Sequence, residues 1–279
     1  MIKLFKLLIT FLLFTVTSAF ALPFGSQSAL VIDENSGEVL LEKNSENIVP
    51  IASLTKLMTA MVVLDAKLDM EEPISIYAQD VDTIKHSTSR VPVGATLPRK
   101  DVLQLALMSS DNRAAAALAR TYPGGKEAFA TALQAKLQAL GMTHTTIEEP
   151  TGLSFHNTSN AADLVKMASA ASQYPDITRI TTDSRDLINI KGRNVEYHNT
   201  NGFVGKKGWD ILLSKTGYTT EAGRCIIMKI KAAGKNVIMV LLNASANSMR
   251  SRDAMNIRRF VSDEKDALVV KTRHAKPAI

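Results

Sequence analysis

The stretch that decides the fold runs from Pro50 to Met61 and reads PIASLTKLMTAM. Its leucines and methionines recur at helical spacing, and a proline stands just before the point where a helix can begin. The pattern predicts a buried helix that starts near Ser53 and runs to about Lys67. Ser53 and Lys56 are three residues apart, so they share one helix face, one turn from each other.

This spacing places a nucleophile beside a base. A serine hydroxyl is a weak nucleophile unless a neighbouring group takes its proton. A lysine amine can do so if it is neutral, and burial in an apolar helix lowers the pKa of a lysine. The alternative is a capping serine beside a surface lysine, because Ser-x-x-Lys is a common accident that also occurs from Ser262 to Lys265.

Two motifs further along the chain favour the catalytic interpretation. Ser-Asp-Asn at 110–112 lies between two helical stretches, and Lys-Thr-Gly at 215–217 ends a strand-like run. Lys-Thr-Gly occurs once, and only one combination has the order Ser-x-x-Lys, Ser-x-Asn, Lys-Thr-Gly. This motif set is typical of the active-site serine enzymes that recognise penicillin.

The motifs suggest how a carbonyl substrate would be held. If Ser53 attacks the carbonyl carbon, the new oxyanion needs preorganised N–H donors. The backbone N–H of Ser53, at a helix N-terminus, is one candidate, and the N–H of Tyr218 on an edge strand is the second. Gly217 would let the substrate backbone approach closely, although a glycine here could also mark a β-bulge.

The remaining motif residues have predicted roles in proton transfer and binding. Ser110 can pass a proton to the leaving amine, or it can simply cap the following helix. Asn112 can hydrogen-bond the substrate amide or hold Lys56 in place. Lys215 and Thr216 can bind a substrate carboxylate by charge and hydroxyl, and the charge of Lys215 should help keep Lys56 neutral. A solvated charge on an edge strand is the alternative for Lys215.

Strand patterns come first and last, with helical patterns between them. Residues 28–33 and 38–42 are predicted to form a hairpin around an Asn-Ser-Gly turn. Further strands are predicted over 187–190, 195–198, 212–216, 225–230 and 237–242. Helices are predicted over 101–109, 113–120, 126–140, 161–171 and 249–261. The predicted class is α+β, in which one antiparallel sheet with flanking helices meets a helical lobe at a cleft.

The N-terminus has the pattern of a secretory signal peptide. Lys3 and Lys6 precede an apolar run, which is followed by an Ala-x-Ala site at 19–21. The run is short for a membrane span. We therefore expect a signal peptide over 1–21, a serine peptidase domain over 22–262, and a basic, loosely ordered tail over 263–279. The expected location is the periplasm, with at most peripheral membrane association.

Composition excludes several other functions. The net charge of +6 is modest and suits anionic cell-wall polymers or membrane surfaces, but no basic block interleaved with aromatic residues points to nucleic acid. The five histidines do not pair at metal-ligand spacing, and no phosphate-binding glycine loop occurs, so neither metal nor cofactor is expected. The single cysteine, Cys225, lies in an apolar run and is predicted to be buried.

From about Ala29 to Phe260 the chain resembles the low-molecular-mass penicillin-binding proteins. Beyond the motifs, four stretches are similar to the D-alanyl-D-alanine endopeptidase branch (penicillin-binding protein 7 type), namely 51–66, 105–125, 149–157 and 199–225. The resemblance implies a transpeptidase/β-lactamase-like fold and an enzyme that cleaves D-Ala–diaminopimelate cross-links in peptidoglycan or removes the terminal D-Ala.

The same resemblance implies residue roles and an inhibitor class. It makes Ser53 the acyl-enzyme nucleophile, Lys56 the general base, Ser110 the second catalytic serine and Lys215 a substrate-binding residue. β-Lactams would acylate the same serine.

Two alternatives stay open at this point. A class A β-lactamase uses a glutamate-primed water for deacylation, and Glu148 and Glu149 lie at a suggestive distance after Ser110. The Pro-Thr-Gly-Leu that follows them resembles the peptidase pattern instead. A non-catalytic wall-binding scaffold with a vestigial site is the third interpretation.

Overall fold

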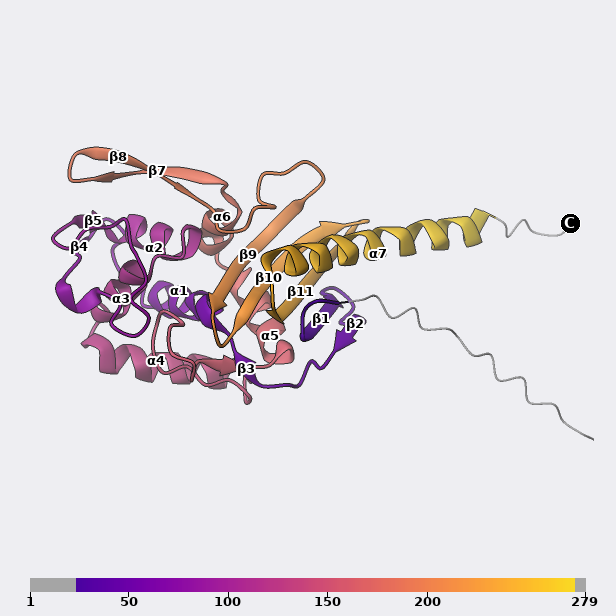
Figure 1. Ribbon diagram of the computed structural model, residues 1–279, viewed down its shortest axis with the longest axis horizontal. Coiled ribbons are helices and arrows are strands. Elements are labelled where there is room, and N and C mark those ends of the chain that lie inside the picture. Colours follow the sequence, from indigo (N-terminus) through magenta and orange to yellow (C-terminus); the bar gives the residue numbers. More distant parts are fainter. Residues whose placement is uncertain (1–23, 274–279) are drawn as a thin grey trace, which may run out of the picture.

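The computed structural model describes residues 24–273, with side chains up to Ser262 (Figure 1). The signal peptide predicted over 1–21 and the last six residues lie outside the described residues. Among the described helices, none is long and apolar enough to cross a membrane.

A five-stranded antiparallel sheet forms the middle layer of the molecule. Its strand order is β2-β1-β11-β10-β9. The strands are β1 (Ser28–Asp33), β2 (Val39–Lys43), β9 (Asp210–Thr219), β10 (Gly223–Ala232) and β11 (Lys235–Ala244). The predicted hairpin therefore joins the last strands of the chain, through the pairing of β1 with β11.

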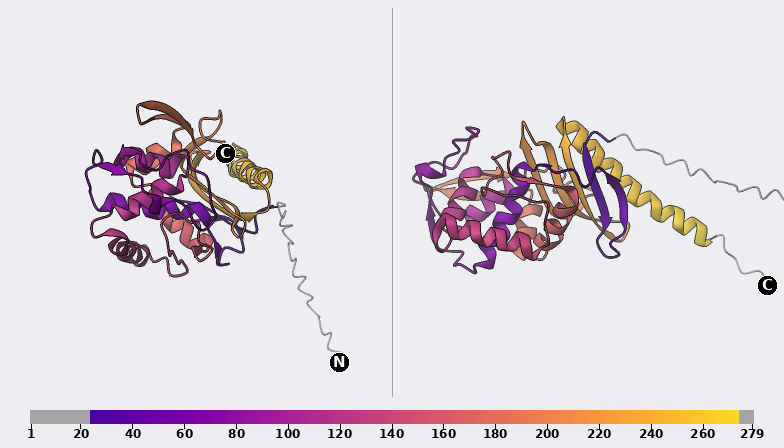
Figure 2. Two further views of the ribbon diagram at one scale, coloured as in Figure 1. Left: turned by 60° about the vertical axis from the view of Figure 1, so that its left-hand side comes forward. Right: turned by 90° about the horizontal axis from the view of Figure 1, so that it is seen from below.

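Both faces of this sheet are covered, which explains the continuous apolar runs in its strands. Along β10, Ile226 and Met228 pack toward helix α7 (Asn247–Arg273), whereas Cys225 and Ile227 belong to the core on the other face. Helix α5 (Ala161–Ala171) packs against that second face. Figure 2 shows the sheet lying between α7 and the helical lobe.

The helical lobe is built around α1 (Thr55–Asp65), the helix predicted to be buried. Nine consecutive residues of α1, from Thr55 to Val63, are buried, so this helix is enclosed on nearly every side, as a central helix must be. Around it lie α2 (Arg99–Met108), α3 (Asn112–Arg120) and α4 (Gly125–Ala139). The predicted α+β class is confirmed.

Several short elements complete the fold. They are the strand pairs β3 (Val49–Pro50) with β6 (Thr158–Ser159), β4 (Pro73–Ser75) with β5 (Thr96–Pro98), and β7 (Arg185–Ile190) with β8 (Arg193–His198), and the 3₁₀ turns η1 (Ala52–Leu54) and η2 (Ala78–Asp80). The prediction that all later strands join one sheet is wrong for β7 and β8. They form a separate hairpin, which buries Ile188, Ile190 and Tyr197 against the lobe and leaves Leu187 exposed.

Two helices differ from the sequence prediction. Helix α6 (Pro175–Thr182) was not predicted, although Pro175 at its first turn and the buried Ile177 and Ile180 are helix signals. Helix α7 continues to Arg273, twelve residues past its predicted end at Val261. The segment predicted as a basic tail from 263 onward is therefore helical as far as Arg273.

Candidate active site

Ser53 lies in the short turn η1, directly before the buried helix α1. The preceding residue, Ala52, has a φ of +47°, a left-handed conformation that costs free energy in an alanine and is typical of functional sites. Lys56 follows in the first turn of α1, and its Nζ lies 2.9 Å from Ser53 Oγ. The predicted pairing of these side chains is present in the structure.

The Lys56 amine is enclosed by oxygen acceptors inside the protein. Its side chain is buried, and its Nζ donates to Asn112 Oδ1 and to the Thr151 carbonyl oxygen, each at 2.7 Å. Burial lowers the pKa of Lys56 from its ordinary value to about 8, and the negative charge of Glu149 opposes part of that shift. Of the two predicted roles of Asn112, the structure shows the contact with Lys56.

Ser110 and Lys215 form a second serine–lysine pair across the site. Lys215 Nζ lies 2.8 Å from Ser110 Oγ and 3.0 Å from the Thr216 carbonyl oxygen. Ser110 has a φ of +60° and does not cap α3, because the Asp111 carboxylate accepts the Ala114 N–H instead. The capping alternative for Ser110 is therefore wrong.

Lys215 is not the surface charge that an edge strand could carry. Only 1% of its surface is exposed, and burial, together with the charges of Lys56 and Arg250, holds its pKa well below the ordinary value. For Lys56, burial is the largest cause of the lowered pKa, rather than the charge of Lys215. The Lys215 amine is thus a buried neighbour of the Ser110 hydroxyl.

Two glycines allow the chain to pack around the peptide between Ala52 and Ser53. A Cβ on Gly217 would lie 2.9 Å from the Ile51 carbonyl oxygen and 3.3 Å from Ser53 N. A Cβ on Gly152, whose φ is +85°, would lie 2.0 Å from the Ala52 carbonyl oxygen. Strand β9 and the loop after Glu149 therefore both pack closely against the turn that carries Ser53.

The cleft beside Ser53 and Ser110 is bordered by hydroxyls and cationic side chains. Thr216 Oγ1 lies 2.6 Å from Thr200 Oγ1, and Arg250 is held by the Cys225 carbonyl oxygen at 2.9 Å. The guanidinium of Arg224 stacks 3.5 Å over the ring of Tyr218, half of which is exposed. The cleft is lined by Ser53, Ser110, Thr200, Thr216, Gly217, Tyr218, Arg224, Asn247 and Arg250.

Sequence reasoning did not find the two arginines of this cleft. The pairing of β10 with β9 places Arg224 opposite Tyr218, and α7 brings in Arg250 from the far end of the chain. Neither position belongs to a motif.

Glu149 organises the loop that follows it. Its Oε1 accepts the N–H groups of Gly152 and Leu153 at 2.6 and 2.8 Å, and its Oε2 accepts the Thr151 N–H at 2.7 Å. Both carboxylate oxygens of Glu149 therefore hold the backbone of its own loop, and this arrangement gives no support to the β-lactamase alternative.

The remaining sequence expectations concern metals and the cysteine. Within residues 24–273, no group of three or more histidine, cysteine, aspartate or glutamate side chains could hold a metal ion. Cys225 is buried, as predicted, and burial raises the pKa of its thiol to about 11.

This architecture is that of the DD-transpeptidases. A solved DD-transpeptidase from Streptomyces superposes with a TM-score of 0.79 at 24% identity, covering 85% of this chain and 97% of the other. A D-alanyl-D-alanine carboxypeptidase from Mycobacterium tuberculosis gives a TM-score of 0.73 at 24% identity, covering 82% and 88%. At this identity the likeness defines the fold.

Sequence comparison defines the family. Residues 15–246 match the D-alanyl-D-alanine carboxypeptidase family. A D-alanyl-D-alanine endopeptidase from Pseudomonas aeruginosa is 46% identical over 238 residues, 85% of this chain and 77% of that protein. One from Escherichia coli is 41% identical over 251 residues, 89% and 81% of the two chains. The chain belongs to this family and is a serine DD-peptidase.

Proposed function

We propose that this DD-peptidase cleaves the peptide cross-links of peptidoglycan as an endopeptidase, through an acyl-enzyme on Ser53. The observation that carries the proposal is the 2.9 Å contact between Ser53 Oγ and the buried Lys56 amine, whose pKa is about 8. The endopeptidases named among its relatives support cross-links as the substrate, with removal of a terminal D-Ala as the related reaction.

The first half of the reaction forms an ester. Neutral Lys56 takes the proton of Ser53 while Oγ bonds to the carbonyl carbon of D-Ala. The backbone N–H groups of Ser53 and Tyr218 stabilise the oxyanion. Ser110, backed by Lys215, gives a proton to the leaving amine as the C–N bond breaks, and the proton that Lys56 took from Ser53 then passes to Ser110, so that Lys56 is neutral again.

The second half returns the free enzyme. Water attacks the ester carbonyl, Lys56 takes a proton from that water, and the bond to Ser53 Oγ breaks as the serine regains its proton. No cofactor enters either step.

The charges of the cleft suit an anionic leaving group. The described residues that line it include Arg224 and Arg250, and Lys215 lies just behind. A carboxylate on the leaving side would be held there by the arginines and the Thr216 hydroxyl. A β-lactam carries a comparable carboxylate beside its reactive carbonyl, so we propose that β-lactams acylate Ser53.

The proposed function also implies a substrate, a cellular location and a domain organisation. The substrate is a peptidoglycan peptide, and the location is periplasmic, after removal of residues 1–21 as a signal peptide. The peptidase domain covers residues 22–262, and the basic C-terminal tail covers residues 263–279. Membrane association is at most peripheral, and no nucleic acid takes part.

Intact mass measured over time with benzylpenicillin tests the nucleophile. The wild-type protein should gain one penicilloyl group that persists for minutes, and Ser53→Ala should gain none. Ser262→Ala is a matched control, because Ser262 begins the other Ser-x-x-Lys and bonds to the Arg258 carbonyl oxygen. It should be acylated like the wild type.

Other outcomes of the mass experiment are equally decisive. Drug loss without an adduct would mean a β-lactamase, and an intact drug without an adduct would mean a non-catalytic scaffold. Purified cross-linked muropeptides then separate the two peptidase activities, since an endopeptidase releases two monomers and a carboxypeptidase releases D-Ala.

A further inference from the structure

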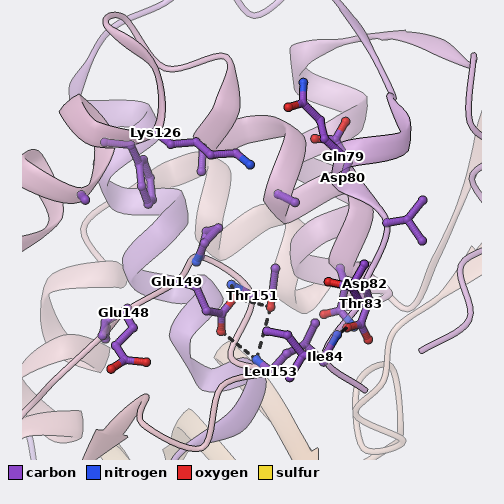
Figure 3. A pocket seen from close by; sticks show the side chains of 18 of the residues that line it. Gln79, Asp80, Asp82, Thr83, Ile84, Lys126, Glu148, Glu149, Thr151 and Leu153 are labelled. Atoms are coloured by element: carbon purple, nitrogen blue, oxygen red, sulfur yellow. Dashed lines mark hydrogen bonds between the residues drawn. The ribbon is translucent and has the colours of Figure 1, made fainter. Parts of the chain in front are cut away.

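A second cavity adjoins the catalytic lysine without sharing a lining residue with the cleft. We name it the side cavity; its volume is about 280 Å³. Asn112 and Thr151 both line it, and both accept a hydrogen bond from Lys56 Nζ. Figure 3 shows it between the loop of Glu149 and Thr151 and the segment of Asp82 and Ile84. It therefore opens next to the reacting groups.

One face of helix α3 forms an apolar wall of the side cavity. Asn112, Ala116 and Ala119 line it at positions i, i+4 and i+7, so they stand one above another on the helix. Phe129 and Leu133 of α4 line it as well. The alanines leave a space beside Asn112 that a larger side chain would fill.

The acidic residues at the side cavity already have partners. Both carboxylate oxygens of Asp80 bond to Arg120 at 2.8 Å. Asp82 accepts the N–H groups of Ile84 and Ser87 at 2.8 Å. The charge of Asp80 is therefore balanced by Arg120, whereas Asp82 is held by hydrogen bonds to its own loop.

Lys126 is the cationic side chain at the side cavity. Across the part of the chain that the structure describes, its ammonium group makes neither an ion pair nor a hydrogen bond with another side chain. The carboxylate of Glu148 bonds to Ser154 Oγ at 3.0 Å, and Figure 3 shows it apart from Lys126. An occupant with an aliphatic body and a terminal carboxylate would match this lining.

We propose that the side cavity is a subsite for the acyl-donor peptide, and that it binds the side chain of the residue preceding D-Ala. The inference rests on the proposed function. Because Arg224 and Arg250 suit a carboxylate on the leaving side, the donor strand extends the other way, past Asn112. A volume of about 280 Å³ accommodates one side chain rather than a whole stem peptide. The preferred side chain is aliphatic and ends in a carboxylate that Lys126 binds.

Two donor peptides that differ by one carboxylate test the charge. They carry diaminopimelate or lysine before D-Ala, and kcat/KM is measured for both. The wild type should prefer diaminopimelate by roughly fivefold, the effect of one partly exposed ion pair. Lys126→Met should remove the preference, and Lys126→Arg should retain it. A preference that survives in Lys126→Met would overturn the proposal.

A substitution that fills the side cavity tests whether the peptide substrate occupies it. Ala116→Leu should lower kcat/KM for both peptides about tenfold more than it lowers acylation by 6-aminopenicillanic acid, a β-lactam without an acyl side chain. Ala135→Leu, on an exposed position of α4 outside the cavity, is the control and should change neither rate.

The two readouts separate failure of the subsite from failure of the enzyme. Equal loss of peptide and β-lactam reactions in Ala116→Leu, or no loss, would overturn the subsite. If the wild type is not acylated by 6-aminopenicillanic acid at all, the proposed acyl-enzyme on Ser53 fails instead.

Discussion

Lys215 Nζ lies 2.8 Å from Ser110 Oγ. The two residues are far apart in the sequence, and folding brings strand β9 and the segment between α2 and α3 together beside Ser53. A buried amine with a lowered pKa can exchange a proton with a hydroxyl at this distance. The pair therefore supplies a route for a proton to the leaving group, separate from the Ser53–Lys56 pair.

Replacing Lys215 by methionine should remove activity without unfolding the protein. Lys215→Met keeps the volume but loses the proton carrier, so penicilloylation should fall by about 100-fold. Because burying a lysine carries a desolvation cost that methionine does not have, and this offsets the lost hydrogen bonds, the free energy of unfolding should stay within about 1 kcal/mol. Rapid-quench mass measurement and thermal unfolding give the two values.

Lys229→Met is the matched control for Lys215→Met. Lys229 lies on the neighbouring strand β10, also largely buried, but its Nζ pairs with Glu34 outside the cleft. This variant should lose stability while acylation stays within about twofold of wild type. If Lys215→Met acylates normally, Ser110 receives its proton from another group.

The motif residues could be predicted from sequence because their chemistry depends on short spacing. Ser53 and Lys56 meet within one helical turn, so local periodicity is enough to pair them. Contacts between Lys56 and Asn112, and between Lys215 and Ser110, depend on how α1, α3 and β9 pack. For these two contacts, the prediction depended on the order of the three motifs and on the family resemblance, because residue spacing says nothing about how distant segments pack.

Other parts of the site have no local signal. Arg250 reaches the cleft only because α7 crosses the sheet, and Glu149 acts through backbone N–H groups, which any sequence carries. The hairpin β7–β8 has the alternation of a sheet strand, but periodicity does not say which sheet a strand joins. Helix α6 is only eight residues long, too short for its period to stand out.

The pKa of Lys56 sets the pH dependence of acylation. Its neutral form is the base, so the rate should rise with pH and level off above about 8, falling about tenfold per pH unit below that value. The check is the initial rate of adduct formation from pH 5.5 to 9.5, corrected for spontaneous β-lactam hydrolysis. A rate that is flat or falls across this range would mean that Lys56 is not the base.

Glu149→Gln should move that pH profile to lower pH. The charge of Glu149 raises the pKa of Lys56, so its removal lets burial depress the pKa further. Because an amide nitrogen replaces an acceptor of backbone N–H groups, the free energy of unfolding should fall by about 1–3 kcal/mol. At a pH well above 8, where Lys56 is neutral in both proteins, adduct lifetime should stay the same, whereas a glutamate that activates water would lengthen it on substitution.

Glu148→Gln is the control for this shift. The Glu148 carboxylate is exposed and bonds to Ser154, and it is not among the charges that shift the pKa of Lys56. Its pH profile should match the wild type. An equal shift in both variants would point to a general charge effect rather than to the loop of Glu149.

Gly152→Ala should damage both folding and catalysis, because the added methyl group has no room. Its Cβ would lie 2.0 Å from the Ala52 carbonyl oxygen and 2.8 Å from Ser53 N, at a φ of +85°. Backbone must move to relieve this contact, and the backbone concerned carries the nucleophile. We expect a loss of about 3 kcal/mol or more in unfolding free energy, measured by urea denaturation, and a large loss of acylation in the folded fraction.

Gly141→Ala is the control that separates backbone strain from steric crowding. Gly141 also has a positive φ, +62°, but nothing lies within 4 Å of its Cβ position. That variant should cost only about 1 kcal/mol and acylate normally. Similar costs in the two variants would mean that the conformation of the glycine, rather than its contact with the turn of Ser53, is what matters at Gly152.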